Sequence, residues 1–226
     1  MSRYKLELLV EQAPESPCDY GDQEWKVYSF QSRHRDNKKR EDFFVEIELS
    51  LRGELPDDET NQPYQPEWEG ADADIRLRLS LGLAQILDYS KHGLCNWSTC
   101  GAGPYTDDEF RRADGIIIWE HPVDILGYKT VEERTEAIRA FLECYTNWCN
   151  GSCYGYRLTD ADTGESNGYL GTFYGDDDLF EALNEELHAE DVIVAVEGNA
   201  AWLLEHNDLK CPILKDCPYE EEERLG

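Results

Sequence analysis

Alternating apolar and polar residues predict strands in the first part of the chain. Residues 3–10 alternate, and residues 25–30 combine aromatic and β-branched side chains. The stretch between them, 13–22, is rich in turn-forming residues, so we expect the two strands to pair in antiparallel fashion. Residues 43–52 place apolar side chains at every second position and predict a further strand.

The middle of the chain contains an acidic, Pro-containing segment followed by two more apolar segments. The segment at about 53–74 contains three Pro residues and many acids, which indicates a long loop or insertion. Residues 76–90 alternate in their first half, and LAQIL in their second half fits either a helix or a buried strand; we favour a strand. The apolar run at 114–120 predicts a buried central strand.

The second half of the chain predicts two helices and a hairpin. Thr130 and Glu133 form a capping box at the start of a periodic helix over about 131–146. Residues 152–174 read as a β-hairpin, in whose turn Gly164 would be left-handed. A second helix begins at Asp176–Asp178, where three carboxylates meet the positive helix end, and it places Leu179, Leu183 and Leu187 on one face.

The end of the chain completes the predicted fold. Residues 191–196 predict a strand, and Asn199 is expected to cap a final short helix. Strands, hairpins and helices are mixed without regular alternation, which favours an α+β fold, mainly an antiparallel sheet with two to three packed helices. We expect one domain over 1–210, including the insertion at about 53–74, and an acidic tail at 211–226.

Charge limits the classes of function. The 226 residues contain 49 Asp and Glu against 21 Lys and Arg, a formal charge of -28. Such a surface disfavours direct binding to nucleic acid or to anionic membranes, and leaves a basic protein as the expected partner. The sequence contains neither a membrane-length apolar run nor the apolar centre of a signal peptide, so we expect a cytoplasmic protein with reduced cysteines.

Chemical motifs are scarce. Walker A, GxGxxG, GxSxG and HExxH sequences are absent, so no catalytic residues are assigned and we lean away from an enzyme. The eight cysteines include Cys95, Cys100, Cys144, Cys149 and Cys153, but none form the CxxC pair that marks a structural zinc site. We therefore expect no cofactor and assign no metal ligands, while a metal-binding module or enzyme that uses these Cys and nearby His residues stays as the alternative.

The distribution of charge is more informative than its total. Residues 158–209 contain no Lys or Arg, although surfaces adapted only for solubility mix both signs. Asp177, Glu181 and Glu185 recur every four residues, so they would line one helix face at steps of about 6 Å, the scale of neighbouring DNA phosphates. A solvated helix face is the alternative reading. The candidate partner-binding residues are Asp176, Asp177, Asp178, Glu181, Glu185, Glu186, Glu190 and Asp191.

Several segments in order resemble a widespread, uncharacterised family of small acidic tailed-phage and prophage proteins. They are EQAPESPCDYGDQEWKVYSFQSRHRD, ILDYSKHG, DGIIIWE, YGYRLTDADTGE and GTFYG. Small acidic phage proteins include inhibitors of host defence, among them anti-restriction and anti-CRISPR proteins that imitate DNA. The resemblance implies an inhibitor in the host cytoplasm whose acidic face occupies the basic nucleic-acid-binding surface of a nuclease or a CRISPR or restriction complex.

Overall fold

The computed structural model describes residues 2–19, 25–31, 72–102, 105, 109, 112–119, 126–188 and 190–206. In chain order its elements are β1 (Arg3–Val10), β2 (Lys26–Ser29), α2 (Asp72–Ser80), β3 (Ala84–His92), β4 (Leu94–Thr99), β5 (Gly115–Ile118), α4 (Val131–Asn150), β6 (Cys153–Asp160), β7 (Leu170–Tyr174), α5 (Asp176–Glu186), β8 (Val192–Glu197) and α6 (Leu203–His206). The predicted α+β fold is confirmed: two mainly antiparallel sheets carry packed helices.

The chain divides into two compact units. Unit 1 contains residues 1–15 and 147–226, and unit 2 contains residues 16–146. One domain over 1–210 stays a prediction; local patterns in the sequence do not reveal that the first strand pairs with strands from the last third of the chain. The predicted strand at 43–52, most of the predicted insertion and the predicted tail lie outside the described residues.

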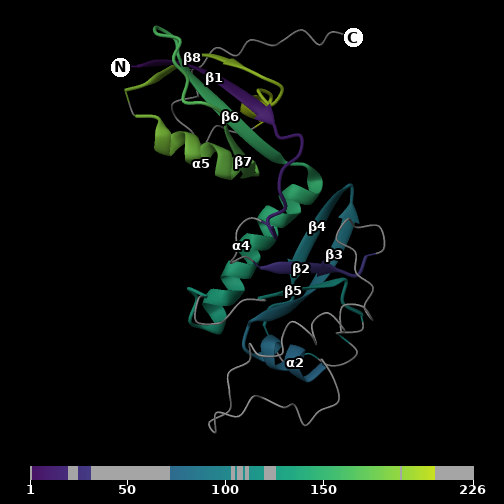
Figure 1. Cartoon of the computed structure of the whole chain (residues 1–226). Helices are drawn as coiled ribbons and strands as arrows, with labels where there is room; N and C mark the ends of the chain where they lie inside the picture. Colours follow the sequence, from purple (N-terminus) through teal and green to yellow (C-terminus); the bar gives the residue numbers. More distant parts are fainter. Residues whose placement is uncertain are drawn as a thin grey trace. The chain divides into compact units, whose positions relative to one another are not determined.

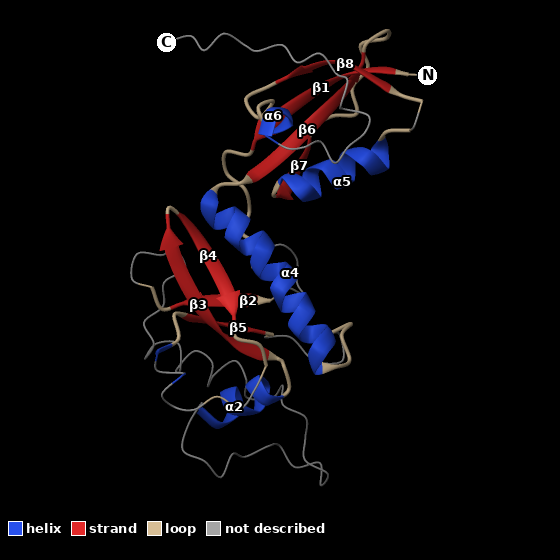
Figure 2. Ribbon diagram, turned by 180° about the vertical axis from the view of Figure 1, so that it is seen from behind, coloured by secondary structure: helices blue, strands red, loops and turns tan. Residues whose placement is uncertain are grey.

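Unit 1 is built on a four-stranded sheet in the order β7-β6-β1-β8 (Figure 1). β6 pairs antiparallel with β1, placing Leu158 opposite Leu6 and Tyr156 opposite Leu8, and β7 pairs antiparallel with β6. β8 runs parallel to β1 at the opposite edge of the sheet from β7, so the connection from β7 to β8 must cross the sheet. α5 makes this connection, and Figure 2 shows it along the sheet.

The core of unit 1 forms between α5 and one face of this sheet. Leu6 and Leu8 of β1 alternate with more exposed residues, and Leu179 and Leu183 of α5 are fully buried against them. Ala200, Ala201 and Leu203 close the same core after β8. The apolar period of four along α5, recognised in the sequence, therefore fixes which face of this helix meets solvent.

Unit 2 contains the sheet β2-β5-β3-β4, with every residue of β5 buried. Ile75 and Leu79 of α2 join the core cluster that contains Ala84 and Ile86 of β3. Gln85, between them on the strand, instead donates from Nε2 to Thr135 Oγ1 of α4 at 3.0 Å. Because strand side chains alternate between faces, α2 and α4 cover opposite faces of this sheet. The prediction of a buried central strand at 114–120 is confirmed.

Three local predictions are corrected by the structure. Residues 76–80 belong to α2, whereas a strand was expected: Ile75 and Leu79 are one helical turn apart and both buried, and Gly82, with φ of 68°, follows the helix end. The expected pairing of the first two strands is wrong, since β1 and β2 find their partners in different sheets. Asn199 does not precede α6 directly; its Oδ1 accepts a hydrogen bond from Val10 N at 2.8 Å.

The capping box of α4 is confirmed. Thr130 Oγ1 accepts from Glu133 N at 3.1 Å, and Glu133 Oε2 accepts from Thr130 N at 3.0 Å and Lys129 N at 2.8 Å. The hydrogen bonds from the Thr130 and Lys129 backbones lower the pKa of Glu133. These bonds satisfy backbone donors that would otherwise lack partners at the start of the helix.

Acidification should therefore remove the contribution of Glu133 to stability. Because its pKa is lower in the folded protein than in the unfolded chain, the contribution is complete above the unfolded value and is lost as pH falls through the folded value. We expect Glu133→Gln to destabilise the protein at neutral pH and to match the parent protein at acidic pH in urea unfolding. The control Glu132→Gln removes a first-turn charge without these hydrogen bonds, and an equal pH dependence in both variants would contradict the prediction.

Candidate protein-binding surface

The start of α5 is set by the turn that follows β7. Gly175 is the N-cap residue with φ of 112°, a conformation that L side chains rarely adopt, and an added Cβ would lie 2.6 Å from Asn147 Nδ2. The same Asn147 Nδ2 donates to Tyr174 O at 2.8 Å. Asp176, Asp177 and Asp178 then form the first helical turn, where carboxylates interact favourably with the helix dipole.

The outer face of α5 is acidic. Asp177, Asp178, Glu181 and Glu185 are all exposed, on the side of the helix opposite the buried Leu179 and Leu183. We call these four residues the acidic face. Successive carboxylates at the four-residue spacing are separated by about 6 Å along the helix axis. The structure therefore brings these predicted residues together on one ordered, solvent-facing stripe.

Basic side chains of unit 1 lie on other elements. Within its described residues the Lys and Arg side chains are Arg3, Lys5 and Arg157, which belong to β1 and β6. Arg3 Nη1 pairs with Asp162 at 3.2 Å, and Arg157 Nη1 pairs with Glu7 at 2.9 Å. No lysine or arginine occurs on α5 itself, so the negative potential of the acidic face is not neutralised from within the helix.

Glu186, at the last turn of α5, has structural contacts. Its Oε1 accepts from Asn167 Nδ2 at 2.7 Å, and its Oε2 accepts from the hydroxyl of the buried Tyr156. Burial raises the pKa of Tyr156, and the hydrogen bond to Glu186 raises it further. Glu186 therefore fixes the end of α5 to β6 and to the loop before β7, and we leave it out of the acidic face.

Asp191 also differs from the other predicted binding residues. It is only 8% exposed; its Oδ1 accepts from Ser2 N at 3.1 Å and its Oδ2 from His188 N at 3.0 Å. The hydrogen bond from the His188 backbone is the main cause that lowers its pKa. Asp191 thus holds the N-terminal residues beside the turn before β8. Sequence reasoning grouped it with surface acids because its partner Ser2 is remote in the chain.

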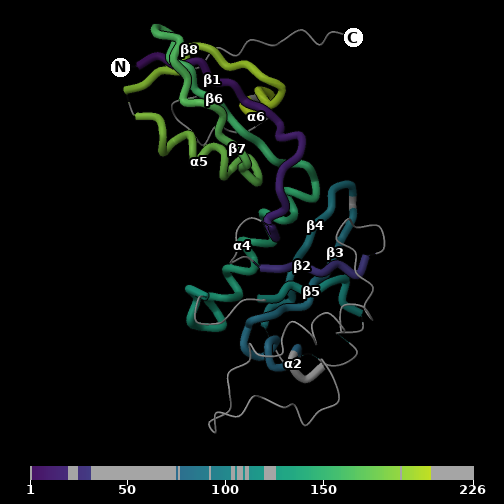
Figure 3. Tube along the Cα trace, viewed as in Figure 1, coloured from purple at the N-terminus to yellow at the C-terminus, as the bar shows by residue number. Residues whose placement is uncertain are grey.

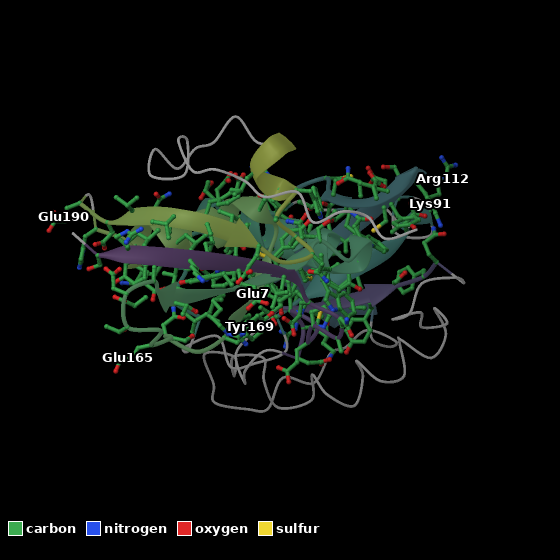
Figure 4. The ribbon with its side chains drawn as sticks, turned by 90° about the horizontal axis from the view of Figure 1, so that it is seen from above. Glu7, Lys91, Arg112, Glu165, Tyr169 and Glu190 are labelled. Atoms are coloured by element: carbon green, nitrogen blue, oxygen red, sulfur yellow. The ribbon has the colours of Figure 1, made fainter. Side chains whose placement is uncertain are left out.

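The remaining predicted residues lie outside the acidic face. Asp176 is half-buried at the start of α5, and Glu190 is exposed in the turn before β8. Figure 4 shows Glu190 and Glu165 projecting outward from unit 1. Of the eight predicted residues, the structure therefore places four on one helix face, two outside it at the helix start and in the turn before β8, and two in structural contacts.

The cysteines do not form a recognisable metal centre in the part of the chain that the structure describes. There, no group of three or more His, Cys, Asp or Glu side chains is arranged to hold a metal ion. Cys153 is fully buried in β6, and Cys100 is exposed, where its Sγ donates to Asp88 Oδ2 at 3.2 Å. The hydrogen bond to Asp88 raises the pKa of Cys100, as do its partial burial and the negative charge of Asp88.

This contact should slow the reaction of Cys100 with alkylating reagents, because only the thiolate is nucleophilic. We expect Asp88→Asn to lower the pKa of Cys100 and to increase its alkylation rate at about pH 8, with no comparable change at Cys95. Peptide mass spectrometry of timed iodoacetamide reactions measures both rates. An unchanged Cys100 rate would show that the carboxylate does not control this thiol.

No helix among the described residues is long and apolar enough to cross a membrane. Comparison with protein-family models, with curated proteins and with solved structures finds no match to this chain.

Proposed function

We propose that this chain is an acidic binding protein that inhibits a basic nucleic-acid-binding protein by occupying its nucleic-acid surface. In the phage setting that the sequence resemblance implies, the partner is a nuclease or a CRISPR or restriction complex in the host cytoplasm. The protein acts by competition and performs no chemistry on the partner. The acidic face of α5 provides the main contact.

One observation carries the proposal: the acidic face is ordered, exposed and free of basic residues on its own helix. Like charges four residues apart on a helix reduce its stability by a few tenths of a kcal/mol per pair, so the acidic face slightly destabilises α5. A basic groove would convert this repulsion into attraction at each carboxylate. The helix is already folded, so docking requires little further loss of backbone entropy.

Electrostatic attraction also determines how such a complex should behave. Many carboxylates facing Lys and Arg accelerate association, and the affinity then falls with ionic strength. Screening shortens the range of these interactions from about 10 Å at 0.1 M salt to about 3 Å at 1 M salt. A complex held mainly by apolar burial would change little over this range.

The proposal is tested by affinity capture followed by a defined binding measurement. The immobilised protein is exposed to host lysate at low salt, retained proteins are identified, and each is purified and titrated against the native protein. We expect a basic nucleic-acid-binding protein whose dissociation constant rises at least about tenfold between 0.1 M and 0.5 M salt. An affinity that does not depend on salt would contradict the proposal.

A further inference from the structure

Tryptophan residues in the described part of the chain fall into two groups. Trp25, Trp97, Trp119 and Trp148 are 3 or 4% exposed, whereas Trp202 is 42% exposed. A single exposed aromatic side chain is common on protein surfaces, so its surroundings decide its significance. Tryptophan is nevertheless enriched, with tyrosine and arginine, among the residues that contribute strongly to binding at protein interfaces.

Trp202 is held by a turn that is itself anchored in the core. Ala201 and Leu203, on either side, are buried, and the turn is closed by hydrogen bonds from Ala201 N to Gly198 O at 3.2 Å and from Leu203 N to Ala200 O at 3.0 Å. This segment leads from β8 into α6 beside β1 (Figure 3). Trp202 therefore extends outward from a fixed backbone.

Tyr154 connects Trp202 to the start of α5. The rings of Trp202 and Tyr154 meet edge to face with centroids 6.4 Å apart, and Tyr154 is buried in the core of unit 1. Cys153, the residue before Tyr154, pairs with Tyr174 at the end of β7, two residues before Asp176. Burial raises the pKa of Tyr154 and the charge of Asp176 contributes to the increase, in agreement with this proximity.

An aromatic face beside carboxylates attracts cations. A guanidinium group suits such a place better than an ammonium group, because it is planar, weakly hydrated, stacks on tryptophan and can donate several hydrogen bonds to a carboxylate. We propose that Trp202, together with the first-turn carboxylates of α5, receives an arginine side chain of the protein partner. This inference rests on the proposed function and specifies which basic residue of the partner makes the contact.

The test uses two labelled peptides of equal length and charge, one of arginine residues and one of lysine residues, titrated by fluorescence anisotropy at low salt. We expect the native protein to bind the arginine peptide about fivefold more tightly than the lysine peptide. Trp202→Ala should reduce this ratio to about one, and Trp202→Phe, which keeps a smaller ring, should leave a ratio of about two. Circular dichroism confirms that each variant is folded.

A matched control and a second variant separate this inference from the proposed function. Leu170→Ala removes another exposed apolar side chain of unit 1 and should leave the ratio unchanged. Asp177→Lys/Glu181→Lys/Glu185→Lys should weaken both peptides together. An arginine preference that persists in Trp202→Ala and Trp202→Phe overturns the inference alone. If the preference depends on Trp202 but the charge-reversed helix binds both peptides normally, the acidic-face proposal is overturned.

Discussion

Reversing the charge of the acidic face should weaken partner binding at least about 100-fold, which corresponds to about 2.7 kcal/mol. The variant Asp177→Lys/Glu181→Lys/Glu185→Lys turns three attractive contacts into repulsive ones on an ordered helix. All three residues are exposed, and lysine and glutamate have similar helix propensities. Loss of the favourable charge at Asp177 near the helix N-terminus costs about 1 kcal/mol or less, so the fold should persist. Titration of the captured partner measures the change.

The control variant changes the net charge by the same amount at other positions. Glu143, Glu165 and Glu197 are exposed and lie outside α5. Replacing all three by lysine should weaken binding much less than reversing the acidic face, because long-range charge alone is screened by salt. Equal weakening by both variants would mean that net charge, and not the helix face, determines binding.

The largest effect on stability is expected at Gly198. Its φ is 100°, and an added Cβ would lie 2.1 Å from Leu8 O, where Ala200 N already donates a hydrogen bond at 3.0 Å. Backbone strain and overpacking each cost about 1–3 kcal/mol, so Gly198→Ala should destabilise unit 1 by about 2–6 kcal/mol. Urea unfolding, with hydrogen exchange at β1 and β8 to locate the loss, measures it.

Gly164 provides the comparison for this prediction. Its φ is 75°, but nothing lies within 4 Å of an added Cβ. Gly164→Ala therefore incurs only the conformational cost, about 1 kcal/mol. If Gly198→Ala were no more destabilising than Gly164→Ala, the close approach of this turn to β1 would not be essential to unit 1.

Local patterns in the sequence were sufficient to predict the helices that are defined by their own capping residues and apolar periodicity. The capping box and apolar period predicted the start of α4, and the three aspartates with leucines at intervals of four predicted α5 and its outer face. The stretch at 76–80 was misread because alternating Arg and Leu over a few residues fits both a strand and one buried stripe of a short helix. Packing of Ile75 and Leu79 decides in favour of the helix.

Features that depend on contacts between residues remote in the sequence could not be predicted from local patterns. The structural roles of Asp191 and Glu186 come from Ser2 and Tyr156, and no local spacing in the sequence indicates either contact. The sequence does not indicate that Trp202 is exposed, because its exposure depends on how the turn after β8 packs against the core. The acidic face itself was found because charge and helical period act within one segment.

Competition between nucleic acid and this chain for the captured partner tests the central claim most directly. The partner is loaded with the protein at low salt and titrated with double-stranded DNA, and both ligands are followed by separate labels. If the acidic face occupies the nucleic-acid surface, the DNA releases the protein in proportion to the affinities of the two ligands, and no ternary complex forms. A stable ternary complex, with the protein and the DNA bound to the same partner molecule, would contradict the claim.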